Sequence, residues 1–191
     1  GASMDMTGLS GSIVAIVTPF KEDRGVDFEA LERLVDFHLA NGTDGILVLG
    51  TTGESSTMTD REDYEVATCV VDRVAGRIPV IGGSGSNSTD ESLRKSLGLQ
   101  KLGVDGLLII TPYYNKSNEE GIYHHLNSVL DAVNLPCILY NIPGRTGCSI
   151  SEKNLARLSR HPNAWGLKEA SGNIAYAATA ARYVSEDFHL F

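Results

Sequence analysis

A helix-capping pattern recurs at a fixed interval along this chain. Thr59, Ser88 and Ser117 each stand three residues before a glutamate, and they are spaced 29 residues apart. In this capping-box spacing the hydroxyl of the first residue accepts a hydrogen bond from the backbone N–H of the glutamate. The glutamate carboxylate in turn accepts one from the backbone N–H of the first residue, at the start of a helix. An interval of this length accommodates one strand and one helix. The sequence therefore predicts a series of strand–helix units.

Short apolar runs and helical periodicity alternate through the whole chain and give six complete units. Strands are expected at 12–18, 45–49, 79–81, 107–111, 137–141 and 165–168, with the start of a seventh at 188–191. Helices are expected at 27–41, 59–74, 88–102, 117–133 and 173–184, with one more opening at Ser151. Parallel strands need crossover helices, and strands that are apolar throughout indicate a sheet covered on both faces.

Two parallel α/β architectures fit this alternation, an open doubly wound sheet and a barrel. Thr18-Pro19-Phe20 follows the first strand, where a dinucleotide-binding fold would carry its glycine fingerprint. Gly82-Gly83-Ser84-Gly85 follows the third strand and fits either a phosphate cradle or, as we favour, a tight turn with close backbone approach. We therefore predict a TIM (β/α)8 barrel, truncated after six βα units and the start of strand seven.

Composition limits the class of protein. Residues 1–10 are expected to be a cloning remnant and an N-terminal tail, and residues 11–191 one barrel domain, incomplete at the C-terminus. The net charge of -8 argues against nucleic-acid and anionic-membrane partners. Cys69, Cys137 and Cys148 lack the spacing of a zinc site or a disulfide framework, which fits a cytoplasmic chain. No apolar run is long enough to span a bilayer.

A single lysine ends the sixth strand, in Gly166-Leu167-Lys168-Glu169-Ala170. Burial disfavours a charged ammonium and lowers the pKa of an amine, and a neutral amine can attack a carbonyl carbon to form a Schiff base. Two interpretations stay open for this residue. Lys168 is either such a nucleophile or a cation that packs its stem at the strand end and pairs with Glu169.

Catalytic groups of a barrel lie at the C-terminal ends of its strands. Here those ends carry hydroxyl groups around one amine: Thr18, Thr51, Thr52, Ser84, Tyr113, Tyr114, Tyr140 and Lys168. Histidines and paired carboxylates are missing from this set, which disfavours metal-dependent hydrolysis and glycosidase chemistry. A phenol near the lysine can move protons to and from a carbinolamine oxygen, and Tyr140 on the preceding strand is the nearest candidate. A packing role for Tyr140 is the alternative.

Arg145 lies in the segment that leaves the fifth strand. A guanidinium there suits a substrate carboxylate, and a surface arginine is the equal alternative.

Four segments in the expected order resemble the dihydrodipicolinate synthase family, the lysine-pathway branch of the pyruvate-dependent class I aldolases. They are residues 50–54 (GTTGE), 111–115 (TPYYN), 140–147 (YNIPGRTG) and 166–170 (GLKEA), and the resemblance extends from residue 11 to residue 191. It implies a synthase that condenses pyruvate with L-aspartate 4-semialdehyde to give 4-hydroxy-tetrahydrodipicolinate, in lysine and diaminopimelate biosynthesis. No cofactor and no metal are implied.

The resemblance also assigns roles to residues. It implies that Lys168 forms the Schiff base with pyruvate and that the loop of Thr51 and Thr52 holds the pyruvate carboxylate. Tyr140 would move protons through Thr51 to Tyr114, which in this family comes from a neighbouring subunit. The implied assembly is a homotetramer, a dimer of dimers. Arg145 would position the carboxylate of aspartate semialdehyde.

Two departures from the family keep alternatives open. Members continue beyond Phe191 with a Ser-Gly-Asp segment, an eighth strand and C-terminal helices, so an inactive truncated fragment is one alternative. A pyruvate-releasing retro-aldolase resembling N-acetylneuraminate lyase is another. The resemblance also implies a possible site for an inhibitory lysine, because Ser55, Asn87, Glu91 and Tyr113 match the family at the positions that contact it. However, Asp60 and Asp63 stand where lysine-inhibited members often carry histidines.

Overall fold

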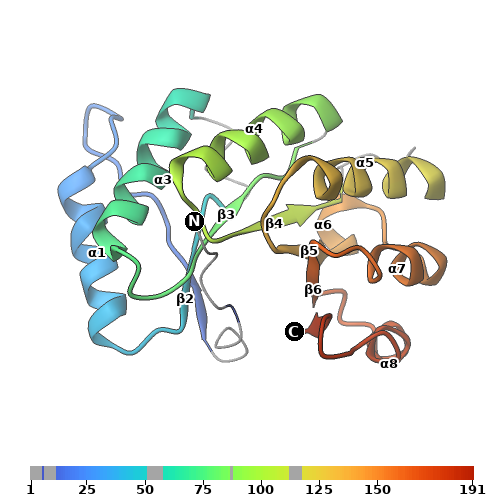
Figure 1. Cartoon of the computed structure of the whole chain (residues 1–191). Helices are drawn as coiled ribbons and strands as arrows, with labels where there is room; N and C mark the ends of the chain where they lie inside the picture. Colours follow the sequence, from blue (N-terminus) through green and yellow to red (C-terminus); the bar gives the residue numbers. More distant parts are fainter. Residues whose placement is uncertain (1–5, 7–11, 51–57, 87, 112–117) are drawn as a thin grey trace. The chain divides into compact units, whose positions relative to one another are not determined.

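Strands and helices alternate along the chain, as Figure 1 shows. The computed structural model describes residue 6 and residues 12–50, 58–86, 88–111 and 118–191. The strands are β1 (Ile13–Ala15), β2 (Gly45–Val48), β3 (Val80–Gly83), β4 (Gly106–Ile110), β5 (Cys137–Asn141), β6 (Ala164–Glu169) and β7 (His189–Leu190). The helices are α1 (Phe28–Ala40), α3 (Asp60–Val74), α4 (Thr89–Leu102), α5 (Glu119–Ala132), α6 (Pro143–Thr146), α7 (Glu152–Leu158) and α8 (Ile174–Ala181).

The chain divides into two compact units, residues 1–83 with 98–106 and residues 84–97 with 107–191. In the first unit β1 pairs with β2 and β2 with β3, all in parallel. In the second unit β4, β5, β6 and β7 pair in chain order, again in parallel. The predicted series of parallel strand–helix units is therefore confirmed within each unit.

In the first unit α1 packs against α3, and α3 packs against β2 and β3. The contact surfaces are apolar side chains at helical spacing, such as Leu31 and Val35 of α1 and Val66 and Val70 of α3, each 0% exposed. Asp27 caps α1 as predicted, because its carboxylate accepts a hydrogen bond from the backbone N–H of Ala30 at 3.0 Å.

The predicted capping boxes have different outcomes. Thr59 and Glu62 form a complete box: the Glu62 N–H donates to Thr59 Oγ1 at 3.1 Å, and the Thr59 N–H donates to Glu62 Oε1 at 3.0 Å. At the second box the backbone N–H of Glu91 donates to Ser88 Oγ at 3.3 Å.

The predicted capping box between Ser117 and Glu120 is wrong. Asn118 is the N-cap of α5 and accepts from the Gly121 N–H at 2.7 Å, while Ser117 lies outside the described residues. An asparagine caps a helix at least as well as a serine, so the helix begins after Asn118. Glu120, released from the predicted box, pairs instead with Arg157 of α7 at 2.9 Å.

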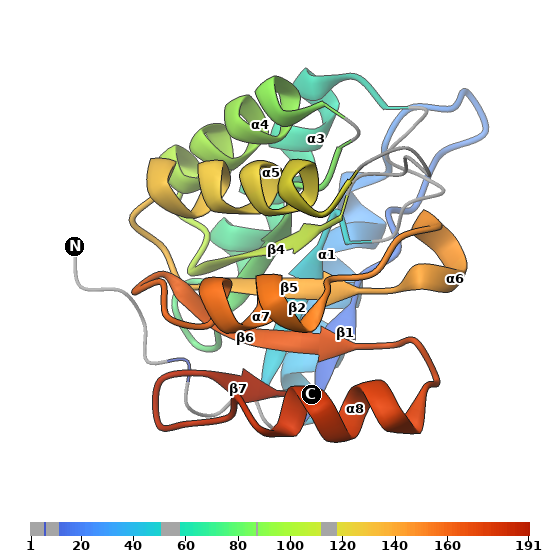
Figure 2. The ribbon, with the colours of Figure 1, turned by 90° about the vertical axis from the view of Figure 1, so that its right-hand side faces the viewer.

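In the second unit α5, α7 and α8 lie on one side of strands β4 to β7 (Figures 1 and 2). α5 packs on α7, and α7 packs on α8. Leu139 of β5 and Leu167 of β6 are both 0% exposed and belong to this core. Ser151 caps α7 as predicted, accepting from the Asn154 N–H at 3.2 Å. The short helix α6 was not among the predicted helices, and Pro143 at its first position favours one helical turn.

His125 of α5 is 2% exposed, and its Nδ1 lies 2.9 Å from Thr89 Oγ1 of α4. Burial, with a smaller contribution from the charge of His124, lowers the pKa of His125. The unfolded chain therefore binds this proton at a higher pH than the folded chain does.

We expect stability to be greatest above the unfolded-state pKa of about 6.5 and to fall as the pH drops below it, by at most about 1.4 kcal/mol per pH unit. The loss should level off once the pH is below the folded-state pKa. Urea unfolding of the wild type and His125→Gln between pH 7.5 and pH 5 measures this slope. An unchanged slope in the variant would contradict the assignment.

Candidate active site

The ends of β5 and β6 bring together the two strongest predicted site residues. Tyr140 is the register partner of Lys168 on the neighbouring parallel strand. The Nζ atom of Lys168 lies 4.8 Å from the centroid of the Tyr140 ring, and both side chains are half-buried. The predicted juxtaposition of amine and phenol is therefore confirmed. Their chemical roles are taken up under the proposed function.

A β-bulge at Trp165 decides this pairing. Cys137 pairs with Ala164 but Ile138 pairs with Gly166, so β6 contains one extra residue at this point. Without the bulge, Leu167 would stand opposite Tyr140, and Lys168 would point to the other face of the sheet. The indole of Trp165 is held by ring contacts to His189, at 4.3 Å between centroids, and to Phe191, at 5.4 Å.

Glu169, the residue after the lysine, is engaged on the opposite face of β6. Its Oε1 accepts hydrogen bonds from Asn141 Nδ2 at 2.9 Å and from the Ser171 N–H at 3.1 Å, and its Oε2 accepts from Ser171 Oγ at 2.8 Å. Successive side chains of a strand point to opposite faces. This arrangement favours the nucleophile interpretation of Lys168 over an ion pair with Glu169.

Tyr176 of α8 identifies the face on which Glu169 lies. Its hydroxyl donates to the carbonyl oxygen of Ile150 at 2.8 Å. Burial, followed by the negative charge of Glu169, raises the pKa of Tyr176. The Glu169 carboxylate thus lies on the α8 side of β6. Because successive side chains of a strand alternate between faces, Lys168 and its register partner Tyr140 share the face turned away from α8.

The backbone of residue 145 lies in α6, and the side chain of Arg145 is outside the described part of the structure. The turn that carries it is anchored by its neighbour Thr146, which is 2% exposed. Thr146 Oγ1 accepts from Thr111 Oγ1 at 3.2 Å and lies 2.9 Å from the Cys148 carbonyl oxygen, to which it donates. This buried pair of hydroxyls connects the end of β4 to α6, and we had not predicted it.

Gly83, the last residue of β3, explains the need for glycine in residues 82–85. A Cβ atom on Gly83 would lie 2.4 Å from the carbonyl oxygen of Leu49 and 3.0 Å from Gly50 Cα, which no residue other than glycine tolerates. Leu49 itself has a left-handed φ of 63° at the end of β2. The favoured interpretation of close backbone approach is therefore supported. This contact shapes the chain immediately before Thr51.

The structure describes only some of the remaining predicted site residues. Thr18 and Ser84 are buried, 5% and 0% exposed. Glu91 lies in the first turn of α4. Six lie outside the described residues, so their predictions stay predictions: Thr51, Thr52, Ser55, Asn87, Tyr113 and Tyr114.

Over the described residues alone, metal-ligand clusters, thiols and helix lengths bear on other kinds of site. No group of three His, Cys, Asp or Glu side chains in the described ranges could hold a metal ion. No disulfide bond joins Cys69, Cys137 and Cys148 within the described part of the chain. Within the same ranges, no helix combines the length and the apolar character needed to span a bilayer.

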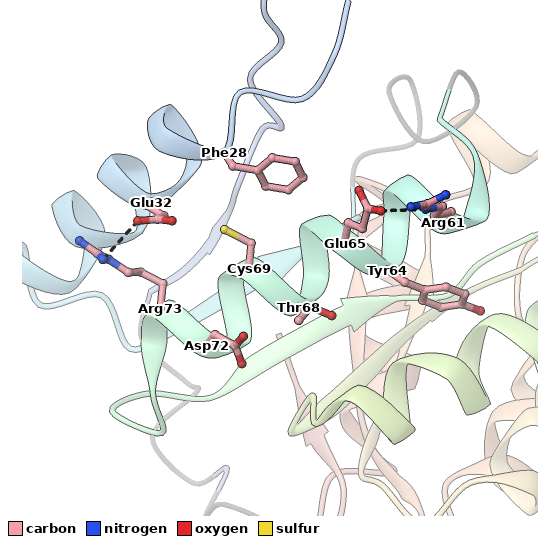
Figure 3. A pocket seen from close by; sticks show the side chains of 9 residues that line it. All are labelled: Phe28, Glu32, Arg61, Tyr64, Glu65, Thr68, Cys69, Asp72 and Arg73. Atoms are coloured by element: carbon pink, nitrogen blue, oxygen red, sulfur yellow. Dashed lines mark hydrogen bonds and ion pairs between the residues drawn. The ribbon is translucent and has the colours of Figure 1, made fainter.

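An open groove of about 980 Å³ runs between α1 and α3 (Figure 3). Its walls carry ion pairs, with Arg73 Nη1 3.2 Å from Glu32 and Arg61 Nε 3.0 Å from Glu65. Burial, together with the charges of Glu32 and Asp72, raises the pKa of the Cys69 thiol. A thiol with a raised pKa is a poor nucleophile. The groove contains none of the predicted site residues.

Comparison with known proteins identifies relatives along almost the whole chain. The model of the dihydrodipicolinate synthetase family matches residues 8–191. The 4-hydroxy-tetrahydrodipicolinate synthase of Caldicellulosiruptor saccharolyticus is 54% identical over 90% of this chain and 58% of its own length. That of Ectopseudomonas mendocina is 48% identical over 96% of this chain and 63% of its own length. The chain thus spans about three fifths of these relatives.

Solved structures show the same relationship. Dihydrodipicolinate synthase from Aquifex aeolicus matches with a TM-score of 0.89 and 43% identity, over 95% of this chain and 62% of that one. The Acinetobacter baumannii enzyme, solved in complex with pyruvate, matches with a TM-score of 0.89 and 42% identity, over 94% and 62%. These neighbours are TIM (β/α)8 barrels. The predicted barrel class is confirmed, and the doubly wound alternative is wrong.

Proposed function

This chain belongs to the dihydrodipicolinate synthetase family, and we propose that it carries the Schiff-base lysine of a 4-hydroxy-tetrahydrodipicolinate synthase. The reaction would condense pyruvate with L-aspartate 4-semialdehyde in lysine and diaminopimelate biosynthesis. The observation that supports this best is the placement of Lys168 beside Tyr140 on one face of adjacent strands. The names of the relatives and the pyruvate complex of one structural neighbour support the substrate.

The first half of the proposed reaction joins pyruvate to the protein. The neutral amine of Lys168 attacks the ketone carbon of pyruvate, and the carbonyl oxygen takes up a proton to give a carbinolamine. A second proton on that oxygen lets it leave as water, and a C=N bond to Lys168 remains. The Tyr140 hydroxyl is the proposed donor and acceptor of these protons.

The second half forms the carbon–carbon bond. Loss of a proton from the pyruvate methyl group gives an enamine, whose terminal carbon attacks the aldehyde carbon of the semialdehyde. The aldehyde oxygen becomes a hydroxyl group as it takes up a proton. The amino group of the semialdehyde then attacks the C=N carbon and displaces Lys168, which closes the ring and regenerates the free amine.

Further groups complete the proposal. Thr51 and Thr52 would hold the pyruvate carboxylate, Arg145 the carboxylate of the semialdehyde, and Tyr114 from a neighbouring subunit would extend the proton relay of a homotetramer. Glu91, with Ser55, Asn87 and Tyr113, would contact an inhibitory lysine. Three cysteines that form no disulfide bond among the described residues fit a proposed cytoplasmic location.

The direction of the reaction follows from the relatives. Those compared above are named as synthases, so we propose condensation rather than the retro-aldol direction of N-acetylneuraminate lyase.

Borohydride trapping tests the proposed function. Incubation of the chain with pyruvate and borohydride is expected to reduce the C=N bond and leave one pyruvate-derived group on Lys168, because reduction makes the adduct permanent. Peptide mass spectrometry identifies the modified residue, and incubation with borohydride alone is the control. A folded chain, shown by a cooperative melting transition, that leaves Lys168 unmodified would overturn the proposal and support the alternative of an inactive fragment.

A further inference from the structure

A buried amide and a carboxylate lie directly behind the amine and the phenol. Asn141 follows Tyr140 in β5, Glu169 follows Lys168 in β6, and the two are register partners. Asn141 is 0% exposed, and its Nδ2 donates to Glu169 Oε1 at 2.9 Å. A bond to an ionised acceptor is stronger than one between neutral groups. It connects the two strands at the position immediately after the proposed catalytic pair.

The position of this pair in the sheet is unusual. Two residues earlier on the same face, Leu139 of β5 pairs with Leu167 of β6, and both are 0% exposed against the helices. Continuing that apolar face would have required no buried polar group. A buried amide and a half-buried carboxylate cost free energy of desolvation unless each is hydrogen-bonded. On this face of β5 and β6, polar side chains take the place of apolar ones only at the C-terminal end of the strands, next to Lys168 and Tyr140.

The hydrogen bonds of Asn141 fix the orientation of its amide. Oδ1 accepts from the Ile150 N–H at 3.0 Å and from Ser149 Oγ at 3.3 Å, so Nδ2 faces Glu169. Residues 142–148, which include α6 and Arg145, lie between the two ends of this bridge. The side chain of Asn141 therefore bridges the two ends of the segment that carries Arg145. The same side chain links β5 to β6.

Glu169 is held in turn by the loop that follows β6. Ser171 donates to it through both its backbone N–H, at 3.1 Å, and its Oγ, at 2.8 Å. The backbone N–H of Ala170 also donates to the carbonyl oxygen of Asn141 at 2.9 Å. The Glu169 carboxylate thus accepts three hydrogen bonds. Because these bonds fix Glu169, the backbone of the preceding residue, Lys168, has little freedom to move.

We infer that Asn141 and Glu169 are positioning residues: their hydrogen bond sets the distance between the Lys168 amine and the Tyr140 hydroxyl and fixes the segment that carries Arg145. This inference rests on the proposed function for its chemical meaning. Neither residue touches the reacting atoms. Both lie on the α8 side of the sheet and act through the strands that they join.

The test exchanges the donor and the acceptor. Asn141→Asp places two carboxylates against each other and removes the donor. The double variant Asn141→Asp with Glu169→Gln restores one donor and one acceptor with the roles reversed. Asn127→Asp is the matched control, because Asn127 Nδ2 donates to Asp131 on the exposed surface of α5 at 3.2 Å. It makes the same chemical change away from β5 and β6.

Two rates are measured for each variant. One is the rate of borohydride trapping on Lys168 at saturating pyruvate. The other is the rate of reductive methylation of Lys168 by formaldehyde and cyanoborohydride, which also forms an imine but needs no pyruvate site. N141D is expected to slow both rates by about 10- to 100-fold, the scale of a small misplacement of reacting groups. The double variant is expected to return close to the wild-type rates, and Asn127→Asp to leave them unchanged.

The outcomes separate the two claims. If N141D keeps both rates and loses only melting temperature, or if the exchange restores stability without restoring the rates, the positioning role is wrong. If Lys168 of the wild type reacts with formaldehyde but not with pyruvate, the proposed function is wrong. The formaldehyde rates of the variants still test the positioning role of Asn141 and Glu169. If N141D does not fold, Glu169→Ala carries the same test without adding a charge, and an unchanged rate there overturns the inference.

Discussion

Replacement of Lys168 by arginine is expected to remove the borohydride-trapped pyruvate adduct completely. Arginine keeps a long side chain at this position, but its guanidinium stays protonated and cannot attack a carbonyl carbon. In a complete synthase, the same change should lower the rate of condensation by on the order of 10³-fold or more, as expected when a covalent nucleophile is lost. Peptide mass spectrometry after trapping gives the modified fraction.

Lys153→Arg is the matched control for this variant. Lys153 lies on α7 with its side chain 66% exposed, so its replacement should leave the adduct at the wild-type level. An adduct that persists in Lys168→Arg at the wild-type level, on whichever residue, would show that Lys168 is not the nucleophile.

Tyr140→Phe is expected to slow adduct formation by about 10²- to 10⁴-fold, the usual contribution of a positioned acid–base group. The change removes only the hydroxyl and keeps the ring that lies 4.8 Å from Lys168 Nζ. The C=N bond should still form slowly, since water can supply the protons. The initial rate of trapping, measured over a range of pyruvate concentrations, separates the maximal rate from the half-saturating concentration.

In Tyr140→Phe we expect the maximal rate of adduct formation to fall and the half-saturating pyruvate concentration to stay nearly unchanged. Tyr183→Phe removes a phenol that donates to Glu152 at 3.0 Å on the surface, and it should behave as the wild type. An unchanged maximal rate in Tyr140→Phe, with a normal melting temperature, would limit Tyr140 to packing against the lysine.

Much of the fold could be predicted because its causes are local. Asp27, Thr59 and Ser151 begin helices where the sequence indicates, since each satisfies N–H groups within three residues of itself. The strands are apolar runs in the expected order, although β1 covers only Ile13–Ala15 of the predicted 12–18. Boundaries were predicted less well where two caps competed, and Asn118 rather than Ser117 begins α5.

The candidate site was predictable only in outline. Lys168 and Tyr140 stand at the ends of consecutive predicted strands, which is enough to expect them near each other in a parallel sheet. The bulge at Trp165 was not predictable from periodicity, because one extra residue in a strand leaves no mark on an apolar run. Without that bulge the same sequence would have turned the lysine to the other face.

The sequence by itself determined the series of strand–helix units, the residues that end each strand and, through four motifs, the family. Capping, periodicity and burial act between residues a few positions apart, so they can be read along the chain. The tertiary structure alone decided which side chains meet. The register of β5 with β6, the hydrogen bond from Asn141 to Glu169 and the contact of Gly83 with Leu49 join residues 27 to 34 positions apart. Such contacts depend on how strands pair, which no local preference specifies.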